Sequence, residues 1–369
     1  MVAGVLAFLC LWGCLGGHRD VAEESPADIL EPVDTIPAPR EVSIVWAGDA
    51  MQHRAQLARA LRPDGTYDYS GCFSGVADYV ARADYAVVNL ETTLGVDDFT
   101  GYPRFCSPRA YADELKRAGF DLFLTANNHC LDRRDAGAVA TLDWLDSLGV
   151  THIGTYRNRA ERDSVLPCVV DIGGIKVGFL NYTYGTNGLR VERDVVADYI
   201  NRDKIGHDIE ATRSAGAEIM AVAMHWGDEY HLLPNDVQRA LADFLVEQGV
   251  GLVIGGHPHV VQPMEMRHGD KGDALVVYSL GNFISGMRTT DTRGGVMVKT
   301  WLRRDGDGTV SVAGAEYLPV FTVPGDSRDP NFHLVVADSC NDPRAKAFLK
   351  NAYGIFDAHN RGVARSRSF

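Results

Sequence analysis

Five separate stretches of this 369-residue chain share one pattern, in which an apolar, strand-like run ends at residues able to bind a metal ion. In open α/β sheets, binding residues gather outside the carboxyl ends of the strands. Carboxylate, amide oxygen and imidazole are donors that divalent cations of intermediate hardness select. The sequence therefore predicts an α/β scaffold with a metal site, of two ions, formed by Asp49, Glu91, Asn128-His129, His225 and His257-x-His259.

Each of the two carboxylates, taken alone, also fits a structural role. Asp49 follows a β-rich run at residues 42–47 and precedes a predicted helix, so helix capping accounts for it better than metal binding does. Glu91 ends an apolar run that starts with a short strand at residues 85–88. A carboxylate in such a place is costly unless it is paired or coordinated. We therefore expect Glu91 to bind metal, with a salt bridge as the alternative.

The adjacent residues Asn128 and His129 give a stronger signal. Asn128 follows a predicted strand at residues 120–124 and offers a neutral amide oxygen as a ligand. His129, beside it, can reach a substrate and donate a proton to a leaving group. The alternative is a turn with an incidental histidine.

The most specific local feature is His257-Pro258-His259. Two imidazoles separated by one residue can point into a single site when the backbone is extended, and the preceding Gly255 and Gly256 allow close approach of the backbone. The alternative is a surface loop with two histidines. His225 follows the apolar run 219–224, and as an isolated residue it would be structural.

Weaker candidates surround these positions. Arg54 could bind a substrate anion with two hydrogen bonds, although a solvated arginine fits the position equally well. A second group is expected to support the ligands or face a substrate, namely Glu229, Tyr230, Tyr182, Ser279 and Asn282. The chain has no Gly-x-Ser-x-Gly, Walker or convincing dinucleotide motif, so nucleophilic serine and nucleotide-cofactor chemistry have no support.

The order of predicted elements indicates two packed sheets. Strands and helices alternate up to residue 148, and strands predominate after residue 260. Parallel β/α units followed by meandering strands favour two sheets packed face to face, with helices outside.

The charge balance limits the choice of partner. With 36 Lys and Arg against 49 Asp and Glu, the net charge is −13. Nucleic acid is therefore not expected to bind. An anionic substrate would need a local cationic site, which bound metal would supply.

The N-terminal residues predict export. Residues 2–17 are apolar but too few to span a bilayer comfortably, and they resemble a secretion signal that lacks a Lys or Arg. Leu11-Trp12-Gly13-Cys14 resembles a lipobox, in which Cys14 would be lipidated and Trp12 is a poor fit. We predict a leader at residues 1–17, a flexible tether at 18–40 and a membrane-anchored lipoprotein of the cell envelope. Export without a lipid, or a misassigned start codon, are the alternatives.

Seven motifs occur in a fixed order: Gly48-Asp49-Ala50-Met51 with Arg54, Asn89-Leu90-Glu91, Asn127-Asn128-His129, His225-Trp226-Gly227 with Glu229-Tyr230, Pro234 with Gln238, Gly256-His257-Pro258-His259-Val260, and Ser279-Leu280-Gly281-Asn282-Phe283. Together they resemble the CapA family of capsule and poly-γ-glutamate biosynthesis proteins, within the metallophosphoesterase (calcineurin-like) superfamily. The resemblance implies a four-layer α/β/β/α sandwich in a domain at residues 41–319, with residues 320–369 as a C-terminal extension.

The resemblance also implies a role for each motif residue. Two divalent ions (Mn, Fe or Zn) are expected, with His129 as the proton donor and a hydroxide bridging the ions as the nucleophile. The first ion would be held by Asp49, Glu91 and His259, and the second by Glu91, Asn128, His225 and His257. The superfamily's usual histidine is replaced by Met51, so the first ion is expected to bind more weakly or to need His53.

Two functions follow from the resemblance. One is a metal-dependent hydrolase of a phosphoester or of a polymer amide bond, working with membrane polymer-synthesis partners in poly-γ-glutamate or capsule biosynthesis and export. The other is a non-catalytic component of a capsule assembly complex that binds an anionic polymer through its metal.

Overall fold

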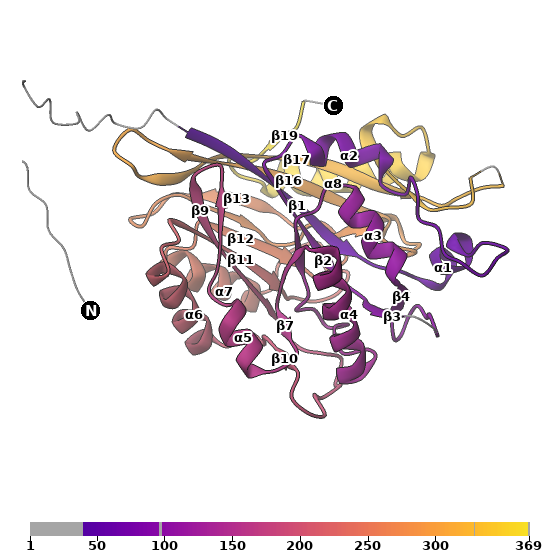
Figure 1. Cartoon of the computed structure of the whole chain (residues 1–369). Coiled ribbons are helices and arrows are strands. Elements are labelled where there is room, and N and C mark those ends of the chain that lie inside the picture. The colour runs from indigo at the N-terminus through magenta and orange to yellow at the C-terminus, as the bar shows by residue number, and fades with distance from the viewer. Residues whose placement is uncertain (1–39, 96–97, 328, 368–369) are drawn as a thin grey trace, which may run out of the picture. The chain divides into compact units, whose positions relative to one another are not determined.

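The computed structural model describes residues 40–95, 98–327 and 329–367 (Figure 1). The predicted leader at 1–17, Cys14 and nearly all of the tether at 18–40 lie outside the described residues. No helix in the described ranges has the length and apolar character needed to cross a membrane.

The first sheet begins with four parallel strands in the order β1-β2-β5-β6. Beyond β1 it continues antiparallel through β16, β17 and β18, and β15 and β19 pair with β1 and β17. The bounds are β1 Arg40–Ala50, β2 Tyr85–Leu90, β5 Leu122–Leu124, β6 Thr151–Ile153, β15 Asn282–Ile284, β16 Gly294–Arg304, β17 Val310–Val323, β18 His333–Val336 and β19 Ala364–Arg365.

The second sheet has the order β13-β14-β12-β11-β9-β8. Its middle strands are parallel, and each edge strand is antiparallel to its neighbour. The bounds are β8 Cys168–Ile172, β9 Ile175–Thr183, β11 Ile219–His225, β12 Leu252–Gly256, β13 Met264–Arg267 and β14 Ala274–Val277. A hairpin at Gly173-Gly174 joins β8 to β9, and both glycines have positive φ as such a turn requires.

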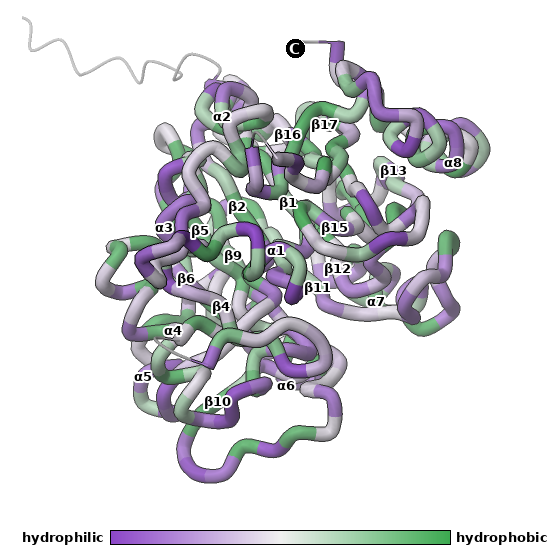
Figure 2. Tube along the Cα trace, turned by 90° about the vertical axis from the view of Figure 1, so that its right-hand side faces the viewer, coloured by the Kyte–Doolittle hydropathy of each residue, from purple (hydrophilic) through white to green (hydrophobic). Residues whose placement is uncertain are grey.

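The alternation of side chains between the two faces of each strand explains how the sheets pack. In β9, Val177 and Phe179 belong to an apolar cluster that also contains Ile44 and Trp46 of β1, so this cluster lies between the sheets. Leu180, one residue on, packs on the opposite face. Successive side chains of a strand alternate between faces, which lets one strand serve two cores. Figure 2 shows the hydrophobic residues concentrated along strands such as β2 and β17.

Helices cover both outer faces. α2 and α3 pack on the first sheet in a cluster that includes Val76 and Leu115, and α6 and α7 pack on the second through residues such as Ile209 and Leu241. The arrangement is the predicted four-layer α/β/β/α sandwich. The helices are α1 Arg54–Ala60, α2 Ser74–Ala81, α3 Arg109–Arg117, α4 Arg134–Leu148, α5 Arg159–Val165, α6 Arg202–Ser214, α7 Asp236–Glu247 and α8 Pro343–His359.

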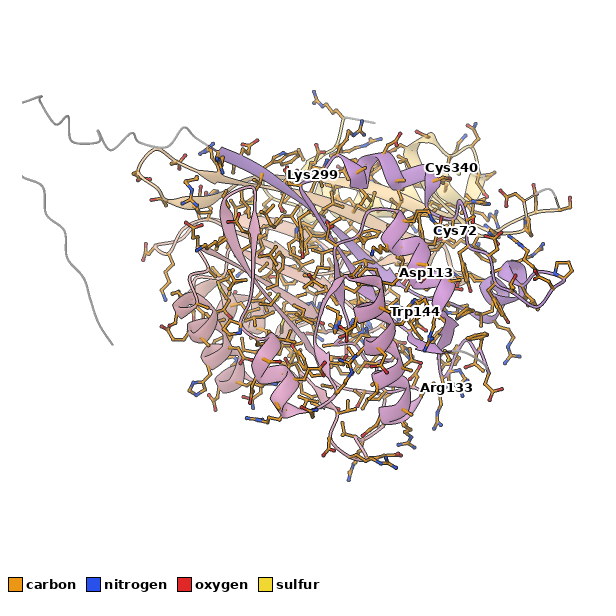
Figure 3. All side chains as sticks on the ribbon, in the orientation of Figure 1. Cys72, Asp113, Arg133, Trp144, Lys299 and Cys340 are labelled. Atoms are coloured by element: carbon orange, nitrogen blue, oxygen red, sulfur yellow. The ribbon has the colours of Figure 1, made fainter. Side chains whose placement is uncertain are left out.

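Helices α3 and α4 are joined through side chains. The indole Nε1 of Trp144 donates a hydrogen bond of 2.7 Å to Asp113 Oδ1 (Figure 3). α4 ends at Gly149, which adopts φ 65° and stops the helix as predicted. The remaining short elements are β3 Thr93–Gly95, β4 Cys106–Pro108, β7 Thr155–Tyr156, β10 Val196–Ala197 and the 3-10 turns at Thr290–Thr292 and Ala337–Ser339.

The C-terminal residues continue the same unit. The predicted boundary at 319/320 falls within β17, and β18 pairs with the end of that strand. Phe348 and Phe356 of α8 pack into the cluster between the sheets. The chain is irregular at residues 260–263, and β13 starts only at Met264.

Candidate metal centre and adjoining cavity

Six predicted ligands converge from both sheets. Asp49 lies near the end of β1, Glu91 follows β2, and Asn128 lies in the loop after β5. The second sheet contributes three imidazoles, since His225 ends β11, and His257 and His259 follow β12. All six side chains are buried. Residues up to 210 positions apart in sequence therefore share one enclosed site.

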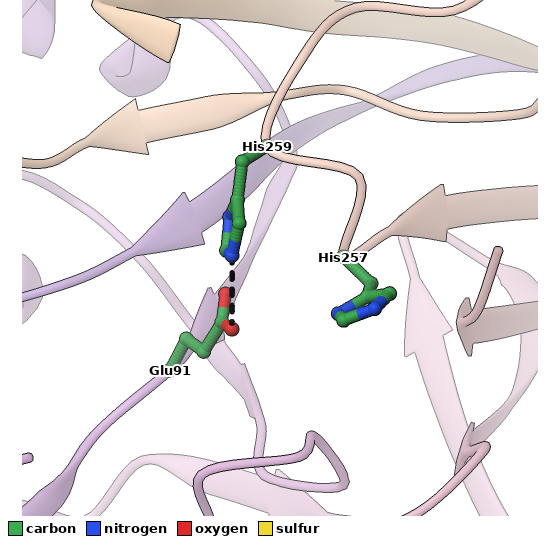
Figure 4. A group of neighbouring side chains, drawn as sticks. All are labelled: Glu91, His257 and His259. Carbon is green, nitrogen blue, oxygen red and sulfur yellow. Dashed lines mark ion pairs between the residues drawn. The ribbon is translucent and has the colours of Figure 1, made fainter. Parts of the chain in front are cut away.

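Short distances connect these side chains. His225 Nε2 lies 2.9 Å from Asn128 Oδ1 and 3.5 Å from Glu91 Oε1. His259 Nδ1 lies 3.3 Å from Asp49 Oδ2, and His259 Nε2 lies 3.9 Å from Glu91 Oε1. Figure 4 shows the ring of His259 pointing at Glu91 with His257 beside them.

Two sets of donors meet the spacing that a metal ion needs. They are Glu91 with His257 and His259, and Asp49 with Glu91 and His225. The closest side-chain contacts instead pair Asp49 with His259 and Asn128 with His225. The resemblance assigns the first pair to one ion and the second pair to the other. The two donor sets group the residues differently, so the assignment of each residue to the first or the second ion stays a prediction. Glu91 belongs to both sets, as a bridging ligand would.

The donor atoms fit a metal ion. Both carboxylate oxygens of Glu91 and Nδ1 of His257 are buried without a hydrogen-bond partner among the described residues. A buried polar atom left unpaired costs about 1–3 kcal/mol. Burial, and then the charge of Asp49, raise the pKa of Glu91 well above its usual value. A cation between these atoms would offset the cost of the unpaired atoms and would also favour the charged form of Glu91.

The other groups are in protonation states that suit coordination. Burial lowers the pKa of His225 to about 3 and that of His257 to about 2, so both rings are neutral. Burial alone would raise the pKa of Asp49, but His259 and His225 outweigh it and lower the pKa to about 2. His259 has a raised pKa of about 9, because Glu91 and Asp49 overcome the effect of burial. Its proton supplies positive charge that a cation would replace.

The backbone around the histidines is strained. His257, His259 and Tyr230 adopt φ values of 100°, 58° and 66°, a region that favours glycine. The Tyr230 amide donates a 2.8 Å hydrogen bond to the Pro258 carbonyl, which ties the two turns together. Such conformations persist where surrounding structure enforces them, commonly at functional sites.

Amide side chains orient the ligands. Asn282 Oδ1 lies 3.0 Å from His259 Nδ1, as predicted for a supporting residue. Asn89 Nδ2 donates to Asp49 Oδ1 at 2.8 Å, and Asn127 Nδ2 donates to Asn89 Oδ1 at 3.2 Å. Sequence reasoning assigned no role to Asn89 or Asn127, although both lie inside the motifs. Partners of this kind fix the orientation of metal ligands.

A histidine–aspartate pair stands beside the ligands. Nδ1 of His129 lies 2.7 Å from Asp132 Oδ2, and Asp132 is buried. This contact places the ring proton on Nδ1 and leaves Nε2 to exchange a proton with a bound molecule. Sequence reasoning missed Asp132, and the His-x-x-Asp spacing is the signal that could have found it.

An open cavity of about 390 Å³ adjoins the pair. Its lining includes His129, Asn187, Glu229, Arg104 and Tyr102. Glu229 thus shares this cavity with His129, and its predicted role near a substrate stays a prediction. The ring of Tyr230 lies 6.2 Å from that of His259 and is exposed on its other side. Arg104 carries no signal in the sequence that would have singled it out.

Three predicted residues do not reach this space. Arg54 is exposed on the first turn of α1 and does not line the cavity. Tyr182 is buried on the outer face of the second sheet, where its hydroxyl bonds Asp208 Oδ2 at 2.7 Å. Ser279 accepts a hydrogen bond from the Gly281 amide and supports a turn. Tyr184 occupies the place expected of Tyr182, with its ring 4.5 Å from that of His257.

In the described part of the chain, no imidazole beyond those of the predicted ligands joins Asp49 and His259. Met51 is buried at the position where the resemblance predicted a difference from the usual histidine. Nδ1 of His53 accepts a 3.1 Å hydrogen bond from the Gly286 amide, and His53 belongs to neither donor set among the described residues. Neither Met51 nor His53 therefore adds to the predicted set of Asp49, Glu91 and His259.

Two CapA proteins are similar to this chain in sequence. Capsule biosynthesis protein CapA of Bacillus anthracis is 25% identical over 283 residues, covering 74% of this chain and 66% of that protein. PGA biosynthesis protein CapA of Bacillus subtilis (strain 168) is 28% identical over 199 residues, covering 54% and 51%. The chain therefore spans between about half and two thirds of the length of these relatives.

Among solved structures, the NAD nucleotidase NadN of Haemophilus influenzae aligns with 90% of this chain and 65% of its own, at 11% identity and a TM-score of 0.47. That score is too low to support a conclusion about this chain. The sequence model of the bacterial capsule synthesis protein PGA_cap family matches residues 43–287, which include all six ligands, His129 and Asp132. The chain belongs to the bacterial capsule synthesis protein PGA_cap family.

Proposed function

We propose that the chain is a metal-dependent hydrolase in the synthesis or export of poly-γ-glutamate or another capsule polymer. The observation that carries the proposal is Glu91, whose two buried oxygens lack hydrogen-bond partners among the described residues and lie between two sets of donors. Names of relatives that refer to capsule and PGA biosynthesis favour a polymer as substrate and membrane synthesis proteins as partners.

The site residues would have different roles in the reaction. Asp49, Glu91, Asn128, His225, His257 and His259 would hold two divalent ions, which when bound act as Lewis acids toward a phosphoryl or carbonyl oxygen. His129 lines the cavity, and its Nε2 would pass a proton to the leaving oxygen or nitrogen as the bond to it breaks. Asp132 holds the ring in place for that transfer. In this scheme Asn187 and Glu229 contact the substrate.

Replacing His129 by alanine tests the chemistry. We expect kcat to fall by about 10²- to 10⁴-fold, the usual contribution of a positioned proton donor, while bound metal is unchanged. Hydrolysis of an aryl phosphodiester and of poly-γ-glutamate with Mn²⁺ is the measurement, and His207→Ala, on the exposed face of α6, is the matched control. Metal-dependent polymer binding without hydrolysis in the wild type would favour the non-catalytic function.

The small number of protein ligands predicted for the first ion implies that the two ions are retained unequally. Because Met51 replaces a histidine and Nδ1 of His53 is already hydrogen-bonded, the position at Asp49 and His259 should lose its metal first. Elemental analysis after mild dialysis should find about one ion per chain at an intermediate stage. Two ions retained equally at every stage would contradict this expectation.

Family membership indicates association with the cell envelope, and we propose that Cys14 provides a lipid anchor. Cys14→Ser should then move the protein from the membrane fraction to the soluble fraction, as measured by fractionation and immunoblotting. Identical distributions of the two forms would exclude lipid anchoring through this residue.

A further inference from the structure

The cavity beside His129 contains two opposite charges that do not neutralise each other. Arg104 and Glu229 both line it, and neither forms an ion pair with a residue in the described ranges, while the Glu229 carboxylate interacts with the Tyr230 side chain. Asp132, the third charged residue of the lining, already contacts His129. A ligand in this space would therefore meet one available cation and one available anion.

The position of Arg104 is fixed relative to His129. The next residue, Phe105, donates its amide proton to Asp132 Oδ2 at 2.6 Å, the same oxygen that contacts His129. Thr100 and Cys106 exchange two backbone hydrogen bonds of 3.0 and 2.8 Å around the segment. The ring of Phe105 also lies 4.6 Å from that of His129. The guanidinium of Arg104 thus extends from a backbone anchored on the proton-donating pair.

The position of Glu229 is fixed relative to the metal ligands. It lies in the turn after β11, and its neighbour Tyr230 is bonded to the Pro258 carbonyl. Tyr230 directly follows Glu229, and the ring of Tyr230 lies 6.2 Å from that of His259. Glu229 is therefore held next to a residue that flanks a predicted ligand.

We propose that this cavity binds a zwitterionic, amino-acid-like chain end, with its carboxylate on Arg104 and its ammonium on Glu229. The assignment rests on the proposed function and narrows its substrate to an amide-linked polymer. A carboxylate inside the cavity repels the doubly charged end of a phosphate monoester, whereas it attracts an ammonium group. The planar guanidinium matches a carboxylate with two parallel hydrogen bonds.

This recognition selects one end of a γ-linked glutamate chain. An interior residue carries a free α-carboxylate but no ammonium, and the last residue carries two carboxylates. Only the first residue has both an α-ammonium and an α-carboxylate. Water would add across the amide that follows it, so that the C–N bond breaks, the carbonyl carbon gains an oxygen and the leaving nitrogen takes its proton from His129. Glutamate would be released one residue at a time from the amino end.

Calorimetric binding of γ-glutamyl trimers to the full chain with Mn²⁺ tests the proposal independently of turnover. Acetylating the terminal amine, or amidating the first α-carboxylate, should each weaken binding about tenfold, the effect of one charge-assisted contact. Glu229→Gln should abolish the penalty for acetylation alone, and Arg104→Gln the penalty for amidation alone. Arg159→Gln and Glu247→Gln, which remove charges outside the cavity, are the matched controls.

The outcomes separate this inference from the proposed function. Equal binding of the free, acetylated and amidated trimers would overturn the inference, even if the protein hydrolyses a substrate. Competition by inorganic phosphate that is stronger than that of the free trimer would overturn it as well. Charge-selective binding by a protein without hydrolytic activity would sustain the inference and refute the hydrolase.

Discussion

Glu91→Gln should abolish the effect of metal on stability. In the wild type, Mn²⁺ at 100 times its Kd should stabilise the fold by about 2.7 kcal/mol per independent site, and this gain should disappear in the variant. Glu91 lies in both donor sets, so a neutral amide there weakens both positions at once. Bound metal should fall below one ion per chain by elemental analysis.

The metal-free proteins should differ little, by about 1 kcal/mol or less, because the Glu91 oxygens have no hydrogen bonds to lose among the described residues. Glu114→Gln is the matched control. That carboxylate is also buried, but it accepts a 2.9 Å hydrogen bond from the Gly71 amide and pairs with Arg117. The Glu114→Gln variant should be less stable than the wild type and should still bind both ions. Full metal binding by Glu91→Gln would show that the carboxylate is not a shared ligand.

Gly255→Ala should destabilise the whole domain by about 3 kcal/mol or more. A Cβ at this position would lie 2.0 Å from the Tyr278 carbonyl oxygen and 2.6 Å from Trp226 Nε1. The carbonyl belongs to the backbone and cannot turn away as the end of a flexible side chain could. The strand edge that carries His257 would therefore shift, and denaturant unfolding should show a lower midpoint.

Gly206→Ala provides the contrast. Gly206 lies within α6, and a Cβ there meets nothing within 4 Å. Alanine in a helix interior is favoured over glycine by about 1 kcal/mol, so this variant should be slightly more stable. If both alanine variants had the stability of the wild type, the close approach of Tyr278 to Gly255 would be wrong.

The candidate ligands could be picked out because each lies at or just after the end of an apolar run. Such ends meet along one edge of a parallel sheet, so Asp49 and Glu91 of the first sheet could be grouped without knowledge of tertiary contacts, and so could His225 and His257 of the second. β1 nevertheless extends to Ala50, beyond its predicted end, because Asp49 pairs with Asn282 of β15. A contact between residues so distant in sequence leaves no local signal.

The residues that would face a substrate were harder to predict than the candidate ligands. Tyr182 lies within β9, one residue before its end, and the alternation of side chains along that strand turns it toward α6 and Asp208. Tyr184, beyond the strand end, reaches His257 instead. Arg104 lies in a loop whose path depends on Asp132, so its place beside His129 follows only from the folded chain.

The division of the six donors between two sheets affects how the protein matures. Asp49, Glu91 and Asn128 belong to one sheet, and the three histidines belong to the other. Neither half alone assembles the complete set, so under the proposed function a partly folded chain would not bind the cations tightly. Metal uptake would then come late in folding, after the two sheets have packed together.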